Sequence, residues 1–324
     1  MILSVLDQTL VSSGSSVEQA FANTVALARS VESLGYHRFW IGEHHGSGVF
    51  ACTAPEVMIA AVAGATSTLR VGSGGVLLSN YSPFKIAEVF RCLEAMYPGR
   101  IDLGLGRAPG GSDLMANALA DGAPTGKESF SRQIRDLIAE LTGATPVSEQ
   151  YAELRPQPVV DSVPAIWGLA SGDGGARSAG QLGLPLGFAH FFNPDTGPDV
   201  ARLYRETFEP SRFAKSPTVA LSVYVTCAET QEQVDRLIRV NDLFALRVVK
   251  GQHIPLPSVE EAAAYTFSAE EQAIVGQVRN RLIAGTPDQV KVELQAMAEA
   301  FGADELVVSA LIHDHDERRS PTRR

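Results

Sequence analysis

The feature that most constrains the fold is a repeated alternation of short apolar runs with longer segments of helical periodicity. Eight runs rich in apolar and β-branched residues predict strands at 2–6, 38–41, 71–77, 101–105, 164–167, 186–189, 219–225 and 305–309. Apolar residues at i, i+3 and i+4 predict helices at 17–34, 55–65, 84–96, 129–141, 175–182, 198–208, 231–243 and 287–301. Eight such units in one chain favour a single (β/α)8 TIM barrel over an open sheet.

The chain length is compatible with this α/β architecture. A chain of 324 residues normally divides into two domains, but a (β/α)8 barrel is the recognised exception. Two stretches fall outside the repeat, at 106–126 after the fourth strand and 247–268 after the seventh. Both are expected on the C-terminal face of the barrel, where βα loops build active sites. We therefore expect one barrel domain over 1–312 and a polar, poorly ordered C-terminal tail over 313–324.

Charge and composition exclude several classes of protein. The formal net charge of −10 argues against a sequence-independent nucleic-acid binder, which needs clustered Lys and Arg. The N-terminal segment MILSVLDQTL has no basic stretch or long apolar run, so we expect neither a signal peptide nor a membrane span. Three widely spaced cysteines fit neither a disulfide framework nor a zinc site, and they suit a reducing cytoplasm.

The segment FWIGEHH at 39–45 is the most informative motif. It places Glu43, His44 and His45 at the C-terminal end of the second strand, where their side chains open into the barrel mouth. A histidine there can hold or move a proton near neutral pH. Capping a helix or satisfying a buried carbonyl is the alternative role for a histidine. Metal binding is not expected, because the adjacent pair lacks a helical i, i+4 spacing and a carboxylate partner elsewhere.

Candidate ligand-binding segments also lie in or directly after the third, fourth and fifth strands. VGSGGVL at 71–77 runs glycines through a strand, which indicates either a place where a flat ligand meets backbone or a tightly packed interior. Arg107 follows the fourth strand, where it can grip a phosphate or form a surface ion pair. After the fifth strand, LASGDGGAR at 169–177 places Ser171 and Gly172 before a helix start, which is either an anion site or a flexible turn.

His190 and Phe191 end the sixth strand. They line a substrate pocket in one interpretation, whereas in the other His190 is a packed loop histidine.

Taken together, RFWIGEHH, VGSGGVLL, PFKIAEVFRCLEAMYPGRIDLGLGRAPG and LASGDGGARSAGQLGLPLGFAHFF resemble the bacterial luciferase-like flavin monooxygenases. Within that family the chain is most similar to actinobacterial members that tailor aromatic polyketides such as mensacarcin, which implies a role in antibiotic biosynthesis. The light-emitting enzymes have a cysteine where this chain has Gly106, so oxygenation without useful light is the expectation.

The resemblance also implies roles for individual residues. His44 matches the histidine near the flavin ring that supports oxygen chemistry, and Glu43 precedes it, so both are expected to be catalytic residues. Gly74 and Gly75 match a pair joined by a cis peptide against the isoalloxazine. Glu88 matches an acidic position near the flavin edge. Three more residues match positions that bind the FMN phosphate, namely Arg107, Ser171 and Gly172.

The activity implied by the resemblance is hydroxylation or epoxidation of a small organic substrate. Reduced FMN and O2 would form a flavin C4a-hydroperoxide, and a separate NAD(P)H-dependent reductase would supply the flavin, because no dinucleotide fingerprint is present. Relatives pair through the helices at 55–65 and 84–96, which implies a homodimer. Two alternatives stay open: a deazaflavin (F420)-dependent hydride-transfer enzyme, and a flavin-binding relative without catalytic activity.

Overall fold

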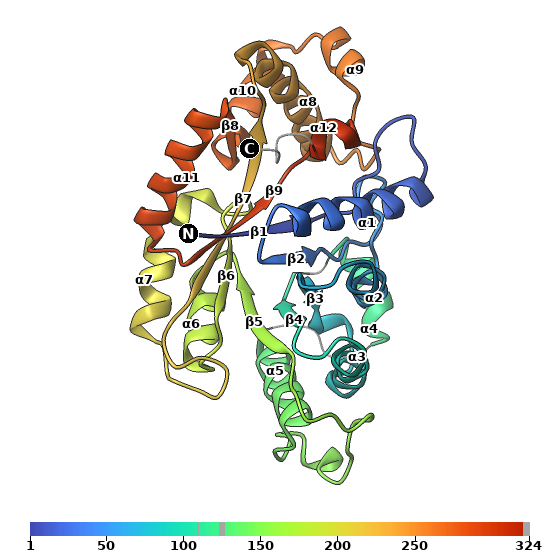
Figure 1. The fold of residues 1–324 in the computed structure, drawn as a ribbon, viewed down its shortest axis with the longest axis vertical. Helices are drawn as coiled ribbons and strands as arrows, with labels where there is room; N and C mark the ends of the chain where they lie inside the picture. The colour runs from blue at the N-terminus through green and yellow to red at the C-terminus, as the bar shows by residue number, and fades with distance from the viewer. Residues whose placement is uncertain (109, 123–126, 320–324) are drawn as a thin grey trace.

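Eight parallel strands close into a barrel in the computed structural model, which describes residues 1–108, 110–122 and 127–319 (Figure 1). The sheet order is β6-β5-β4-β3-β2-β1-β9-β7, and β6 also pairs with β7, which closes the ring. These strands are β1 (Ile2–Asp7), β2 (Arg38–Ile41), β3 (Arg70–Leu77), β4 (Ile101–Gly106), β5 (Ala165–Ala170), β6 (Leu186–Ala189), β7 (Val219–Cys227) and β9 (Glu305–Ser309). The expected (β/α)8 barrel is confirmed.

A ninth strand, β8 (Leu282–Gly285), was absent from the prediction. It pairs in parallel with the last residues of β7, from Tyr224 to Cys227, outside the closed ring. The run is only four residues long and follows a helical segment, so no periodicity separates it from a loop.

Helices surround the barrel as the alternation predicts. The main ones are α1 (Val17–Ser33), α2 (Pro55–Ala65), α3 (Pro83–Met96), α5 (Lys127–Thr142), α6 (Asp173–Gln181), α7 (Asp199–Glu206), α8 (Gln231–Val249) and α11 (Pro287–Phe301). Local signals fix their ends: Ser16 caps α1 by accepting from Gln19 N, and Gly302 ends α11 with φ of 57°. None of the helices in the described part of the chain combines the length and apolar character that a bilayer crossing needs.

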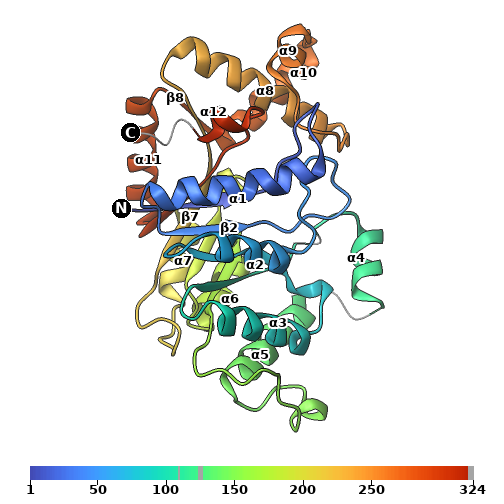
Figure 2. The ribbon, with the colours of Figure 1, turned by 45° about the vertical axis from the view of Figure 1, so that its right-hand side comes forward.

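The two stretches outside the repeat form additional helices. After β4 the chain forms α4 (Asp113–Ala120), which lies at the outer edge of the molecule in Figure 2. After β7, α8 continues six residues beyond the expected end at 243 and is followed by α9 (Val259–Ala264) and α10 (Ala269–Val278). The excursion after β7 is therefore longer than the expected 247–268, because it extends through α10 to β8. Short 3-10 turns lie at Leu78–Asn80, Glu149–Tyr151, Pro194–Thr196 and Arg279–Arg281.

Part of the polar C-terminal segment is ordered, which differs from the expectation of a disordered tail. His315–Arg319 form the short helix α12, which contacts α1 (Figures 1 and 2). Arg318 is 7% exposed and forms an ion pair with Asp7 at the end of β1, with an Nη2 to Oδ1 distance of 2.6 Å. A buried carboxylate needs such a partner, so the segment attaches to the barrel through a charge pair rather than an apolar contact. Residues 320–324 lie outside the described part.

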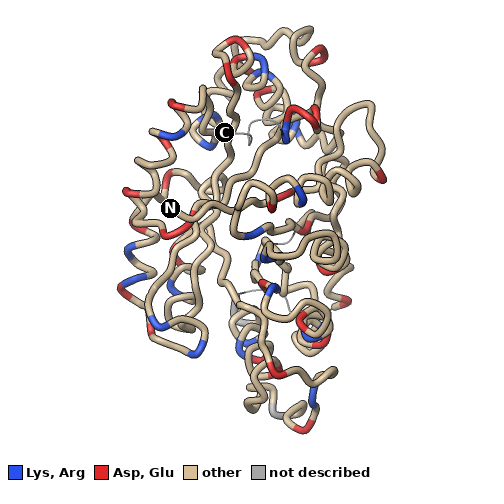
Figure 3. The backbone as a smooth tube through the Cα atoms, viewed as in Figure 1, with Lys and Arg blue, Asp and Glu red and all other residues tan. Residues whose placement is uncertain are grey.

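An aromatic cluster and an ion network fill the inside of the barrel. Trp40 and Trp167 meet edge to face with centroids 5.2 Å apart, in a cluster that also contains Leu6, Phe191, Ala220 and Val307. Beside them Arg38 forms ion pairs with Asp102 at 2.6 Å and Glu305 at 2.7 Å. On the outside, basic and acidic residues are interspersed along the helices (Figure 3). The polar mouth described below is built at the C-terminal ends of the strands.

Candidate active site

Glu43 joins the ends of β2 and β3. It is 5% exposed, and its Oε1 accepts a hydrogen bond from Tyr81 Oη at 2.7 Å and contacts His45 Nε2 at 2.8 Å. Its Oε2 accepts from Leu77 N at 2.9 Å, at the last residue of β3. Burial raises the pKa of Glu43, and these three hydrogen bonds oppose the rise. Because both oxygens have protein partners, the carboxylate is suited to positioning the mouth rather than to exchanging protons.

His44 has the opposite character. Burial first, and the neighbouring His45 second, lower the pKa of His44 to about 4, so the imidazole is neutral at pH 7. Its Nδ1 is buried without a hydrogen-bond partner among the described residues, and its ring packs on Phe50 with centroids 4.4 Å apart. A neutral ring with an unused nitrogen can accept or donate one hydrogen bond to a bound molecule. No group of three or more potential metal-ligating side chains occurs in the described ranges.

Gly74 and Gly75 lie in a close-packed part of β3. The peptide bond between them is cis, as the resemblance implied. A Cβ on Gly74 would lie 2.7 Å from Leu6 Cδ1, and one on Gly75 would lie 2.7 Å from the Gly104 carbonyl oxygen. Pairing with β4 shifts register between Ser73 and Val76. Interior packing therefore accounts for both glycines, and contact of this backbone with a flavin ring stays a prediction.

Arg107 and the start of α6 follow neighbouring strands. Leu105 of β4 pairs with Gly168 of β5, so Arg107 and Ser171 come within three residues of the same paired position. Arg107 is exposed, and none of the hydrogen bonds and ion pairs of the described residues involves its side chain. Gly172 caps α6 without a side-chain hydrogen bond, and a Cβ there would meet only Asn193 Nδ2 at 4.0 Å. A free cation and an open helix start form a combination that fits a phosphate.

Two residues that the sequence predicts for the site, Glu88 and His190, contact neighbouring segments of the chain, and their roles stay predictions. Glu88 lies on α3, where its Oε1 accepts from Gln157 N at 3.4 Å, in the loop before β5. The ring of His190 meets Phe301 of α11 edge to face with centroids 5.9 Å apart, so it faces the helical layer. This contact favours the interpretation of His190 as a packed loop histidine, and its role in a substrate pocket stays a prediction.

Phe191, next in the chain, points inside and stacks on Tyr224 with ring centroids 4.4 Å apart. Successive side chains near the end of a strand alternate between faces, which separates the two neighbours.

Three polar residues at the mouth are not predicted by the sequence. Tyr81 donates to Glu43, and Gln8 and Tyr224 lie near the barrel centre, where burial raises the pKa of Tyr224 to about 12. None of the three belongs to a motif, and an isolated Gln or Tyr at a strand end carries no recognisable signal. Only the alternation of Leu6 and Gln8 along β1 indicates that Gln8 points inward.

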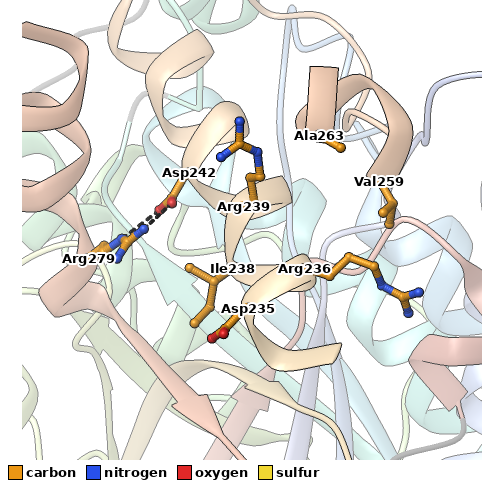
Figure 4. A pocket seen from close by; sticks show the side chains of 8 residues that line it. All are labelled: Asp235, Arg236, Ile238, Arg239, Asp242, Val259, Ala263 and Arg279. Atoms are coloured by element: carbon orange, nitrogen blue, oxygen red, sulfur yellow. Dashed lines mark hydrogen bonds and ion pairs between the residues drawn. The ribbon is translucent and has the colours of Figure 1, made fainter. Parts of the chain in front are cut away.

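A hollow of about 420 Å3 lies elsewhere, between α8, α9 and the turn after α10 (Figure 4). It is lined by Asp235, Arg236, Ile238, Arg239, Asp242, Val259, Ala263 and Arg279. Its charged groups already have partners: Arg279 forms a bidentate pair with Asp242, and Arg239 donates to the carbonyls of Ala262 and Tyr265. We therefore place the candidate active site at the strand ends, where buried polar atoms lack partners, rather than here.

Comparison with known proteins shows the family of this chain. The model of the luciferase-like monooxygenase family matches residues 1–305. The Luciferase-like monooxygenase of Escherichia coli (strain K12) is 35% identical over 315 residues, covering 97% of this chain and 93% of that protein. The N-acetyl-S-alkylcysteine monooxygenase of Bacillus subtilis (strain 168) is 34% identical over 318 residues, covering 98% and 95%. The crystal structure of apo-MsnO8 is 37% identical with a TM-score of 0.89, covering 99% and 96%. By family match and by near full-length relatives, this chain is an enzyme that belongs to the luciferase-like monooxygenase family.

Proposed function

We propose that this enzyme is an FMN-dependent monooxygenase that inserts one oxygen atom of O2 into a small organic molecule. The observation that carries the proposal is the presence, at the C-terminal strand ends of one barrel, of an anion site after β4 and β5 and a neutral histidine after β2. Arg107 and the start of α6 offer the anion site, and His44 offers a ring nitrogen without a partner. Reduced flavin together with O2 supplies the oxygen-transfer chemistry when bound.

The hydrogen-bond donors at this site suit the phosphate of an FMN molecule. Arg107 can grip the phosphate through two parallel hydrogen bonds, and Ser171 and the backbone N–H groups after Gly172 can add donors. The flavin ring would lie against the backbone of Gly74 and Gly75. His44 would then hold a proton-exchanging position close to the reacting atoms, while Phe50 excludes water from one face of its ring. Glu43 would act as a positioning residue through Leu77 N and Tyr81.

The test is a comparison of FMN with riboflavin, which lacks the phosphate. Arg107→Ala should weaken FMN binding about 10- to 100-fold, the value of a charge-assisted hydrogen bond, and leave riboflavin binding unchanged. Arg202→Ala is the matched control, because Arg202 lies on the outer helix α7 with 67% of its side chain exposed. Equal weakening of both ligands, or none of either, would contradict the assignment of the phosphate site.

The same titration with F420 decides between the two cofactors. The proposal expects reduced FMN to bind and to consume O2 after rapid mixing. Tight binding of F420, with substrate reduction that does not require oxygen, would instead support hydride transfer. Binding of FMN without any reaction of the reduced form would support a relative without catalytic activity.

Two proposals on partners follow from the same function. A separate NAD(P)H-dependent flavin reductase would supply reduced FMN. A homodimer would form through α2 and α3, where Val57 and Met96 are 65% and 58% exposed. Sedimentation of the purified protein at micromolar concentration tests the dimer, and a monomer alone would refute it. Location in the cytoplasm also stays a proposal.

A further inference from the structure

Gln8 follows β1, and contacts of its two neighbours in the chain, Asp7 and Thr9, hold it in place. Asp7 is fully buried and accepts from Thr24 Oγ1 at 2.5 Å and Arg318 Nη2 at 2.6 Å. Thr9 has φ of 52°, a left-handed conformation that is a genuine outlier for a β-branched residue. Ala51 N donates to Thr9 O at 2.9 Å and holds this bend. Backbone strain of this kind persists only where the surroundings hold it, and it concentrates at functional sites.

Gln8 and His44 each place an unpartnered polar atom beside Gly42. Gln8 is 3% exposed, and its Oε1 and the Nδ1 of His44 are both buried without a hydrogen bond to any described residue. A Cβ built on Gly42 would lie 2.5 Å from Gln8 Oε1 and 3.5 Å from His44 Nδ1. Both atoms therefore lie close to a single point. Leaving a buried acceptor unpaired is costly, and a ligand that supplies the missing donor recovers that cost.

Aromatic rings flank the two atoms. Phe50 packs on the ring of His44 at 4.4 Å between centroids, and Phe191 stacks on Tyr224 at 4.4 Å. Burial raises the pKa of Tyr224, and the side chain of Gln8 offsets part of that rise by hydrogen bonding to the hydroxyl. The amide oxygen of Gln8 has no partner among the described residues, so it is left for another donor. Flat apolar walls with a few convergent polar atoms are typical of small-molecule sites.

We propose that Gln8 and His44 together bind one hydroxyl group of an aromatic substrate. The hydroxyl donates its hydrogen to Gln8 Oε1, and its oxygen accepts from His44 in the tautomer that carries hydrogen on Nδ1. The inference rests on the proposed function, because it assigns the substrate class of that same site. Gln8 is then a specificity-determining residue, and it selects phenol-like compounds over hydrocarbons of the same shape.

The test compares 2-naphthol with naphthalene as probes, by calorimetric titration of the protein with and without FMN. Gln8→Met keeps the length of the side chain and removes both polar atoms. We expect the preference for 2-naphthol, expressed as the ratio of the two affinities, to fall about tenfold in Gln8→Met, the value of one buried hydrogen bond. Tyr265→Phe, which removes a hydroxyl that donates to Glu271 of α10, should keep the ratio of the unmodified protein.

A second variant keeps the inference testable if Gln8→Met does not fold. Tyr224→Phe removes the hydroxyl whose pKa the Gln8 side chain lowers, so it should lower the same ratio about threefold. An unchanged ratio in the folded variants overturns the inference, and so does a Gln8→Met protein that loses FMN affinity but keeps the ratio. Failure of the proposed function is seen separately, since wild-type protein would then bind no flavin while Gln8 still governed the naphthol ratio.

Discussion

Replacing Asp102 by Asn should destabilise the barrel more than the loss of any exposed ion pair would. Asp102 is fully buried, and its Oδ2 accepts from Arg38 Nη1 at 2.6 Å and Trp40 Nε1 at 3.1 Å. Its Oδ1 accepts from Arg70 at 2.5 and 2.9 Å. The Asn variant keeps the shape but removes the charge and turns an amide N–H2 toward guanidinium donors. Breaking a buried ion pair costs about 3–5 kcal/mol.

The structure places the expected loss near the lower end of that range. Glu305 still pairs with Arg38 at 2.7 Å, and the side chain of Arg70 is 24% exposed and can reach water. A loss of about 3 kcal/mol corresponds to a decrease in Tm of about 5 °C for a domain of this size.

The assay is thermal unfolding followed by circular dichroism, with urea titration as a second measure. Asp199→Asn is the matched control, because its pair with Arg202 has side chains 81% and 67% exposed, and such pairs contribute less than about 1 kcal/mol. If both variants lower Tm equally, the buried ion network around Asp102 does not stabilise the fold more than an exposed ion pair does.

Three further predictions concern the strand ends. Burial lowers the pKa of His44 from 6.5 to about 4, so between these pH values the unfolded state binds more protons, and stability falls as the pH drops through that window. His44→Gln should therefore reduce the decrease in urea midpoint between pH 7 and 5. An unchanged decrease would contradict the pKa shift of His44. Arg318→Met leaves the buried Asp7 without its cation and should cost about 3 kcal/mol in urea titration. Arg236→Met removes the more exposed pair of the same segment with Glu317, and an equal effect there would refute a special role for the buried Asp7–Arg318 pair. Gly75→Ala pushes a methyl group against the Gly104 carbonyl oxygen and should cost about 2 kcal/mol by thermal unfolding, while Gly276→Ala, with nothing within 4 Å, should not lower Tm.

The alternation of strands and helices, and with it the closed barrel, could be predicted from the sequence alone. Periodicity encodes which residues face the helical layer locally, and parallel strands joined by helices leave little choice of topology. The same logic placed Glu43, His44, Arg107 and Ser171 at the C-terminal ends of strands, because a residue that follows a barrel strand lies at the mouth.

Only the tertiary structure decided which of these residues have protein partners. The ion pair of Asp7 with Arg318 joins residues 311 positions apart, and it turns an expected loose tail into part of the barrel. His190 and Phe191 adjoin in sequence, yet the end of β6 directs one to the helical layer and the other to the interior. Gln8 carries no motif, and it becomes notable only because the pairing of β1 with β2 brings it beside His44. Local patterns fix backbone geometry and burial, whereas the partner of a polar atom depends on contacts between distant segments that form when the barrel closes.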